Sequence, residues 1–184
     1  MIRGSMVSLR AVEREDLEIL RDWRNRSEFR KYFREVRELN MENQISWFEK
    51  SCRNNPNDFM FIIQDAKTGE PIGACGLLYI NGVIRSADFS FYIGKNGYYI
   101  DDQGLALEAA QLLIDYGFSY LNLNKIWMEL YEFDQLKQSF FKEKFGFKQD
   151  GILRQNCFDD GRYWDSVIIS LLRDEHIMND DKLL

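Results

Sequence analysis

The sequence predicts one α+β domain whose mixed, mostly antiparallel central sheet is flanked by helices. Strand-like segments broken by the turns AKTGE and NG indicate an antiparallel meander between residues 58 and 94. The helical segment that follows leads to KIWMELY at 125–131, and a helical crossover between two strands implies parallel pairing. A length of 184 residues with 45% hydrophobic content fits a single core.

The first part of the chain predicts a strand followed by helices. Residues Val7–Ala11 alternate like a strand, and Glu13–Asn25 carries large apolar side chains at spacings of three, which is typical of one helix face. We expect a second helical stretch after Arg30. Asn40 is a suitable N-cap for a helix over Met41–Arg53.

The rest of the chain alternates strands with helices. Strands are predicted over 58–65, 71–80, 84–94, 125–131, 147–158 and 163–172. Apolar spacing predicts a long helix from Leu105 to about Leu121. Asp134 can cap a last helix that ends at Gly146. The two final strands form a hairpin around the turn DDG.

These elements place a single domain at residues 6–175. The opening MIRGS resembles a cloning remnant or an alternative start ahead of Met6, so residues 1–5 are expected to lie outside the fold. Residues 176–184 are expected to form a polar tail.

Composition argues against several classes of protein. A net charge of −6 and a pI near 5.0 argue against nonspecific nucleic-acid binding, which needs clustered Lys and Arg. No apolar run approaches the roughly 20 residues of a membrane span, and no signal-peptide pattern opens the chain, so a cytoplasmic protein without membrane contact is expected. The three cysteines form no CxxC pair, which favours buried thiols over a metal site. Because His176 is the only histidine, catalysis must use carboxylates, Tyr, Lys or backbone.

One stretch, Phe89–Phe118, brings a strand, a glycine-containing turn and a helix start together. Backbone N–H groups around Gln103, Gly104 and Ala106 are expected to point out of the helix start. Such groups, together with the positive end of the helix dipole, attract anions, and a glycine lets a phosphate come close to the backbone. The stretch therefore predicts an anion site.

Four local signatures resemble the GNAT superfamily of acyl-CoA N-acyltransferases. They are SLRAVEREDLEILRDWRN, SADFSFYIG followed by DDQGLALEAA, KEKFGF, and GRYWDSVIISLL. The resemblance runs from Met6 to Arg173, and its first and last parts are similar to the branch of ribosomal-protein N-terminal acetyltransferases and amino-sugar-nucleotide acetyltransferases. It implies a GNAT-like fold in which the fourth and fifth strands splay apart, with acetyl-CoA as co-substrate and its pantetheine arm in the gap.

The resemblance also implies which residues contact this co-substrate. The backbone of Phe91 and Ile93 is expected to hold the pantetheine arm. The pyrophosphate is expected at the turn before the long helix, at Gln103, Gly104, Leu105 and Ala106. The family's Asn before the last helix maps near Gln135, and Asp134 or Ser139 can share its role.

Two residues of this turn depart from the family pattern. Asp101 stands where Gln or Arg is usual, and Asp102 replaces a glycine. A carboxylate about 4 Å from a phosphate costs on the order of 4 kcal/mol at an effective dielectric near 20, before salt reduces it. Alternatively, one Asp caps the helix and leaves Gly104 and Ala106 to the phosphates. We expect CoA binding with modified contacts.

Acyl transfer to an amine needs a base for the nucleophile and a proton source for the leaving thiolate. Asp88 lies at the carboxylate position of the family's fourth-strand pattern and is the candidate base; it could instead be a solvated residue or a partner of Arg85. The family's general-acid Tyr is replaced by Lys142, which can serve as donor if buried. Tyr131 and Tyr163 are substitutes, and a thiolate can also leave without a dedicated acid.

The end of the first helix borders the acceptor site in relatives. Arg24 and Asn25 are the candidates for acceptor contacts, and Arg24 could grip a phosphate bidentately, whereas Trp23 is expected to be packing. The sequence therefore predicts an acetyl-CoA-dependent N-acetyltransferase acting on a small primary amine, with an amino-sugar nucleotide first. The alternatives are a ribosomal-type protein N-terminal acetyltransferase and a catalytically impaired GNAT-like binding module. A homodimer is compatible with the sequence.

Overall fold

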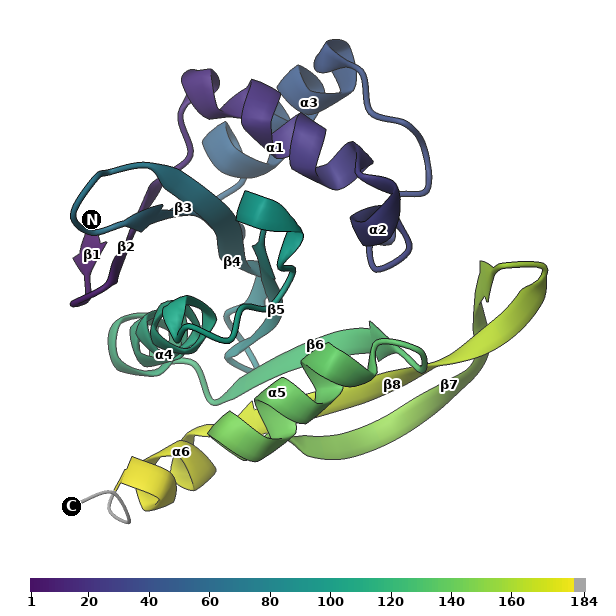
Figure 1. The fold of residues 1–184 in the computed structure, drawn as a ribbon. Helices are drawn as coiled ribbons and strands as arrows, with labels where there is room; N and C mark the ends of the chain where they lie inside the picture. The colour runs from purple at the N-terminus through teal and green to yellow at the C-terminus, as the bar shows by residue number, and fades with distance from the viewer. Residues whose placement is uncertain (181–184) are drawn as a thin grey trace.

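The computed structural model describes residues 1–180, with side chains through His176 (Figure 1). Its strands are β1 (Ile2–Arg3), β2 (Val7–Ala11), β3 (Phe59–Asp65), β4 (Pro71–Asn81), β5 (Ser86–Ile93), β6 (Lys125–Tyr131), β7 (Lys148–Asp159) and β8 (Arg162–Leu172). Its helices are α1 (Leu17–Asn25), α2 (Ser27–Arg30), α3 (Met41–Trp47), α4 (Leu105–Asp115), α5 (Gln135–Phe145) and α6 (Arg173–Asp180). Helical turns extend α3 to Arg53 and α4 to Tyr120.

All eight described strands form one sheet in the order β1-β2-β3-β4-β5-β6-β8-β7. Only the β5–β6 pair is parallel, and every other neighbouring pair is antiparallel. The α+β class, the meander and the terminal hairpin predicted from the sequence are confirmed.

The parallel pair is short. Residues Ser86–Asp88 pair with Lys125–Trp127, and beyond Asp88 the two strands separate, while β6 continues to pair with β8 as far as Tyr131. The predicted splay between these strands is thus present. It leaves the second half of β5 facing α5 rather than a strand.

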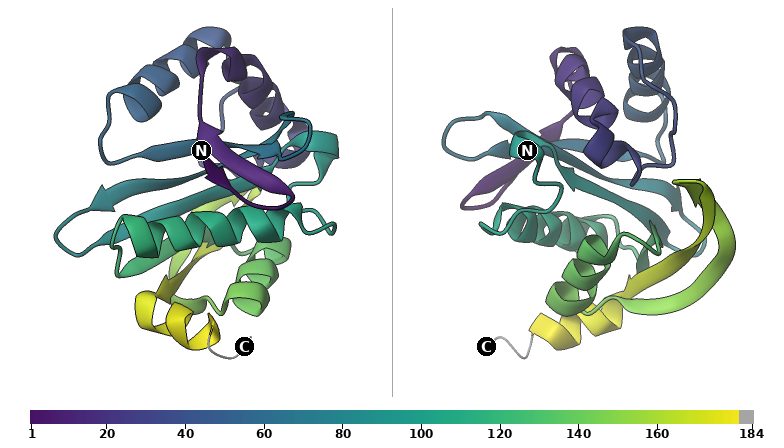
Figure 2. Two further views of the ribbon diagram at one scale, coloured as in Figure 1. Left: turned by 90° about the vertical axis from the view of Figure 1, so that its left-hand side faces the viewer. Right: turned by 45° about the vertical axis from the view of Figure 1, so that its right-hand side comes forward.

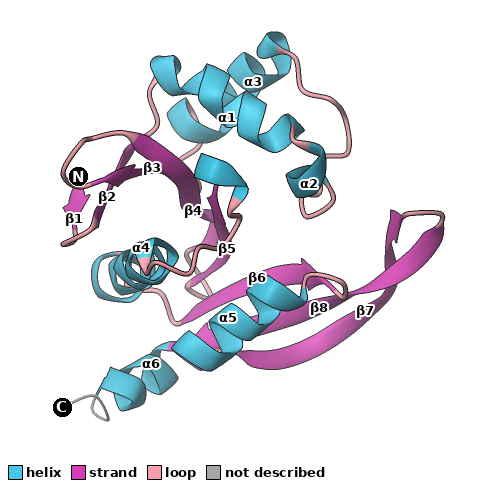
Figure 3. Ribbon diagram, in the orientation of Figure 1, coloured by secondary structure: helices cyan, strands magenta, loops and turns pink. Residues whose placement is uncertain are grey.

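Helices cover both faces of the sheet. Helices α1 to α3 lie over one face, and α4 and α5 lie over the other (Figures 2 and 3). The caps follow the sequence signals, since Asn40 accepts from the Asn43 N–H, and α5 begins after Asp134 and ends at Gly146. The helical stretch expected after Arg30 is wrong: α2 ends there, and 31–40 form turns and loop.

The first residues belong to the fold, contrary to the boundary expected at residue 6. Strand β1 pairs with β2, and the Glu108 carboxylate on α4 accepts the backbone N–H groups of Ser5, Met6 and Val7, each at 2.7 Å. Gly4 permits this approach, because a Cβ there would lie 2.7 Å from Glu108 Cδ. At the other end α6 reaches Asp180, beyond the domain end expected at residue 175, and the part of the expected polar tail at 181–184 lies outside the described residues.

Over the described part of the chain, no helix has the length and apolar character that a membrane crossing requires. In the same part, no group of three His, Cys, Asp or Glu side chains is placed to hold a metal ion. The three cysteines are free thiols, with Cys75 buried and Cys52 and Cys157 half-buried.

We predict that Glu108→Gln lowers the free energy of unfolding by about 1–2 kcal/mol at neutral pH, because it weakens hydrogen bonds to a carboxylate. Burial acts to raise the pKa of Glu108, but the hydrogen bonds from Ser5, Val7 and Met6 hold it below the usual range. A carboxylate with a lowered folded-state pKa stabilises the fold above its unfolded pKa and loses that contribution as pH falls through the folded pKa. The difference between wild type and variant should therefore vanish in acid.

Urea denaturation at several pH values measures this effect. Glu143→Gln is the matched control, because Glu143 is exposed on α5 and forms no side-chain hydrogen bond or ion pair with the described residues. An equal loss of stability at every pH would contradict the electrostatic origin.

Candidate active site

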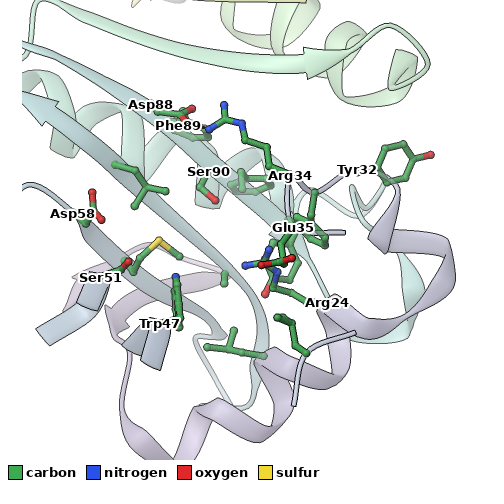
Figure 4. A pocket seen from close by; sticks show the side chains of 18 of the residues that line it. Arg24, Tyr32, Arg34, Glu35, Trp47, Ser51, Asp58, Asp88, Phe89 and Ser90 are labelled. Atoms are coloured by element: carbon green, nitrogen blue, oxygen red, sulfur yellow. Dashed lines mark hydrogen bonds and ion pairs between the residues drawn. The ribbon is translucent and has the colours of Figure 1, made fainter. Parts of the chain in front are cut away.

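A cavity of about 570 Å³ lies between β5 and the α1–α3 layer, beside the splay (Figure 4). One wall comes from α1, the loop 31–40 and α3, and the other from β4, β5 and β6. The charged side chains that line it are Arg24, Arg34, Glu35, Arg37, Lys50, Asp58, Asp88, Glu129 and Lys137. The cavity is therefore polar and carries charges of both signs.

Asp88, the predicted base, lies on this wall and is only 5% exposed. Its Oδ2 atom accepts a hydrogen bond from Arg34 Nη1 at 2.9 Å, and Arg34 also lies 3.4 Å from Glu129 (Figure 4). Arg34, and not Arg85, is thus its partner. Burial raises the pKa of Asp88, while Arg34 opposes that rise. The carboxylate is consequently a stronger base than one in water.

Of the three predicted proton donors, Tyr163 is exposed on β8 and does not line the cavity, and the other two lie in different places. Tyr131 lines the cavity at the end of β6, and burial raises its pKa to about 12, so it stays protonated near neutral pH. Lys142 lies half-buried on α5, where its Nζ is 3.4 Å from Gln138 Oε1, and it is not among the cavity's lining residues. Of these two candidates, only Tyr131 shares the cavity with Asp88.

Lys137 is a site residue that the sequence analysis missed. Its side chain is buried, lines the cavity and donates a hydrogen bond from Nζ to the Phe91 carbonyl at 2.6 Å. The signal was present, since Lys137, Phe141 and Phe145 recur at spacings of four on the buried face of α5. A charged residue on such a stripe indicates a polar contact inside the fold.

The β5 backbone groups expected to hold the pantetheine arm face the splay but have partners within the chain. The Phe91 carbonyl accepts from Lys137, and the Ile93 N–H donates to the Tyr99 carbonyl at 2.8 Å. A carbonyl oxygen has a second lone pair, so Phe91 can accept one more hydrogen bond.

The predicted anion cradle at the start of α4 exists, and the chain's own carboxylate is in it. Asp101 accepts the N–H groups of Gln103 at 2.8 Å, Leu105 at 3.1 Å and Ala106 at 2.5 Å. Gly104 has φ of 94°, a left-handed conformation that suits glycine. The N–H groups therefore point out of the helix start as expected, with Asp101 as their partner, and the alternative in which Asp101 caps the helix is confirmed.

The expected cofactor contacts on α5 are not on its inner face. Gln135 and Ser139 are exposed, and Gln135 donates to the carbonyl of Glu132. Asp134 is buried instead, where it caps the helix and accepts the Tyr99 hydroxyl at 2.7 Å. The buried face of α5 passes through Lys137 and Gln138 instead, and the contacts of Gln135 and Ser139 with CoA stay predictions.

The acceptor candidates also separate. Arg24 lines the cavity with its guanidinium 4.7 Å from the Phe33 ring centre, and the guanidinium forms no hydrogen bond or ion pair with the described residues. Asn25 instead exchanges two hydrogen bonds of 2.8 Å with the Leu39 backbone, so it holds the loop 31–40 in place. Trp23 is buried packing, as expected.

Comparison with known proteins identifies relatives of this chain. A family model described as an acetyltransferase (GNAT) domain matches residues 7–148. The N-acetyltransferase p20 of Bacillus licheniformis is 31% identical over 92% of this chain and 94% of its own length. Spermidine N(1)-acetyltransferase of Vibrio cholerae is 28% identical over 95% of this chain and 97% of its own.

A solved structure shows the same likeness. The spermidine N-acetyltransferase from Vibrio cholerae in complex with CoA and spermine superposes with a TM-score of 0.84 at 27% identity, covering 95% of this chain and 99% of that one. The cavity and the splay of the chain therefore lie in a fold that binds CoA in a relative.

We predict that Asp101→Asn raises CoA affinity about tenfold. The neutral amide neither repels the pyrophosphate nor competes as strongly for its N–H groups, and a gain of about 1.4 kcal/mol in binding free energy corresponds to a factor of ten. The amide still accepts backbone N–H groups, so stability should fall by no more than about 1 kcal/mol. Calorimetric titration with CoA measures the affinity.

Asp102→Asn is the control, because Asp102 is the exposed neighbour with the same charge. An equal gain in both variants would mean a general charge effect. A loss of affinity in Asp101→Asn would show that Asp101 supports the bound state.

Proposed function

The chain belongs to the GNAT acetyltransferase family, and from that premise we propose that it acetylates a primary amine held in the cavity beside Asp88. The observation that carries this proposal is a buried carboxylate at the last paired residue before β5 and β6 separate. It brings a base next to the gap in which the thioester of acetyl-CoA is expected.

The residues divide the chemistry between them. Acetyl-CoA, the co-substrate of the family, supplies the activated acetyl group. Asp88 takes a proton from the incoming amine, and Arg34 fixes the direction of that carboxylate. Tyr131 lines the same cavity as a protonated hydroxyl that can donate a hydrogen bond. The β5 backbone at Phe91 and Ile93 keeps its expected role of binding the pantetheine arm.

The start of α4 suits the pyrophosphate of CoA, but one side chain of the chain itself competes for the same N–H groups. The Asp101 carboxylate stands where a phosphate oxygen is expected, and its hydrogen bonds to residues 103–106 support an environment suited to an anion. In the proposal the pyrophosphate takes these N–H groups when Asp101 turns away, and Gly104 leaves the approach open.

For the acceptor, we place a polyamine first. Two of the proteins named above are spermidine acetyltransferases, and one of these is solved with CoA and spermine. The carboxylates of Glu35, Asp58, Asp88 and Glu129 line the cavity, and a polycation can bind them in exchange for the contacts that Arg34 and Arg37 make there. This replaces the amino-sugar nucleotide as the leading acceptor.

An amine that carries an anionic group, such as an amino-sugar nucleotide, remains the second candidate. The Arg24 guanidinium faces the cavity and has no ion pair among the described residues, whereas Glu35 and Asp88 are paired with Arg37 and Arg34. An unpaired guanidinium is a suitable partner for a phosphate or carboxylate. A protein N-terminus and a homodimer stay predictions, tested with N-terminal peptides and by light scattering.

We predict that Asp88→Asn lowers kcat by about 10²–10³-fold through loss of the general base, with CoA affinity unchanged. In wild type, activity should fall as pH drops through the pKa of Asp88, because only the ionised carboxylate accepts a proton. Since that pKa is raised, the acid limb should lie above the usual range of Asp. Initial rates of thiol release across pH measure both effects.

Glu129→Gln is the comparison, since Glu129 also contacts Arg34 in the same cavity. Its activity should fall far less. An equal loss in both variants would mean that the charge around Arg34, and not the base, had been removed.

We predict that Arg24→Met separates the two acceptor classes. It should raise the KM of an anionic amine about tenfold or more by removing a charged contact, and leave or lower that of spermidine. A panel of spermidine, spermine and amino-sugar phosphates, with Arg154→Met as an exposed control, measures this.

Turnover of spermidine alone would exclude the anionic class. CoA binding with no turnover of any amine would contradict the proposed function and favour the binding module.

A further inference from the structure

Lys137 connects α5 to the part of β5 that has left its parallel partner. It is 7% exposed, and its Nζ lies 2.6 Å from the carbonyl of Phe91, three residues beyond Asp88, where the β5–β6 pairing ends. The ammonium is therefore inside the splay and on the wall of the cavity.

A buried ammonium in this place lacks the partners that normally stabilise one. Of its three N–H donors, one is bonded to Phe91, and no carboxylate lies within 4.0 Å of it among the described residues. The Tyr99 ring, with its centre 5.2 Å away, gives a weaker contact. Burying a charge without a direct ion pair is unfavourable, so the remaining donors are available to a ligand.

The charged and titratable groups around Lys137 come from its own helix and from three neighbouring segments. Asp134 lies on its own helix, Asp88 on β5, Arg34 on the loop 31–40, and Tyr99 on the loop before α4. Burial lowers the pKa of Lys137, Asp134 and Asp88 oppose this, and Arg34 adds to the lowering. The ammonium is thus a stronger acid than a lysine in water.

We propose that Lys137 donates the proton to the sulfur of CoA as it leaves the acetyl group, in a role that rests on the proposed function. The amine nitrogen forms a bond to the acyl carbon, and the bond from that carbon to sulfur breaks with its electron pair on sulfur. The sulfur takes a proton from Nζ, and the proton of the amine goes to Asp88. Solvent then returns a proton to Lys137 and removes one from Asp88.

The geometry favours Lys137 over the donors expected from the sequence. Lys142 does not line the cavity, and its Nζ lies 3.4 Å from Gln138 Oε1. Tyr131 is in the cavity, but a pKa raised to about 12 makes it a poor donor to a thiolate. Lys137 combines a place in the splay with a lowered pKa.

The test follows the thiol of bound CoA by its ultraviolet thiolate absorbance, without any acceptor. A neighbouring ammonium stabilises a thiolate, so in the wild-type complex the thiol should titrate about one pH unit or more below free CoA. Lys137→Met should abolish that shift, Lys137→Arg should keep it, and Lys142→Met should leave it intact.

Steady-state kinetics with an active amine give the second readout. Lys137→Met should lower kcat about 10²-fold, as expected for loss of a general acid, with little change in KM. Wild-type kcat should fall at alkaline pH as Lys137 loses its proton, and this limb should be absent in Lys137→Met. In Lys137→Arg the limb should move out of the measurable range, since a guanidinium keeps its proton.

The outcomes separate the two proposals. A wild-type complex whose thiol titrates like free CoA overturns the role of Lys137 whatever the variants do, including a variant that fails to fold. A shift that survives in Lys137→Met also overturns it. If the thiol pKa shifts as expected but no amine is acetylated, the proposed function is overturned and the contact of Lys137 with CoA stands. If the chain binds no CoA, both the proposed function and the role of Lys137 are overturned.

Discussion

The site depends on where the parallel pairing of β5 and β6 stops. Beyond Asp88 the β5 backbone has no strand on that side, and buried N–H and C=O groups must find partners elsewhere. Lys137 bonds the Phe91 carbonyl, and the Tyr99 carbonyl accepts the Ile93 N–H. The break in the ladder therefore both opens the gap and determines which side chains enter it.

The same requirement pairs several polar groups of the site with one another. Arg34 connects Asp88 to Glu129, and the carboxylate of Asp101 fills the start of α4. At these groups a ligand consequently enters by exchanging hydrogen bonds with the chain, whereas Arg24 and the remaining donors of Lys137 are open to it. Such an exchange weakens binding but favours ligands that replace every bond, because an unsatisfied buried group costs about 1–3 kcal/mol.

The sequence predicted those features that repeat along it, and missed those that depend on one long-range contact. Alternation and helical spacing located the strands after residue 58 and the helix from Leu105, since burial acts on many residues at once. The loop 31–40 has no period, so the contact of Arg34 with Asp88 across 54 positions left no pattern. Strand β1 is two residues long, which is too short for an alternation of apolar and polar residues to predict it.

At the start of α4 the sequence correctly predicted an anion site, but in the structure the anion bound there is the Asp101 carboxylate. The turn and the helix start do form an anion site, as the glycine and the helix dipole imply. A carboxylate tethered two residues away has a high effective concentration there, so it binds first. The Asp101 carboxylate therefore weakens CoA binding chiefly because it competes with the pyrophosphate for the same N–H groups. Once the side chain has turned out toward solvent, it no longer occupies them. Repulsion between fixed charges, by contrast, would persist in every conformation, which is why an acidic residue at this turn is compatible with a family that binds CoA.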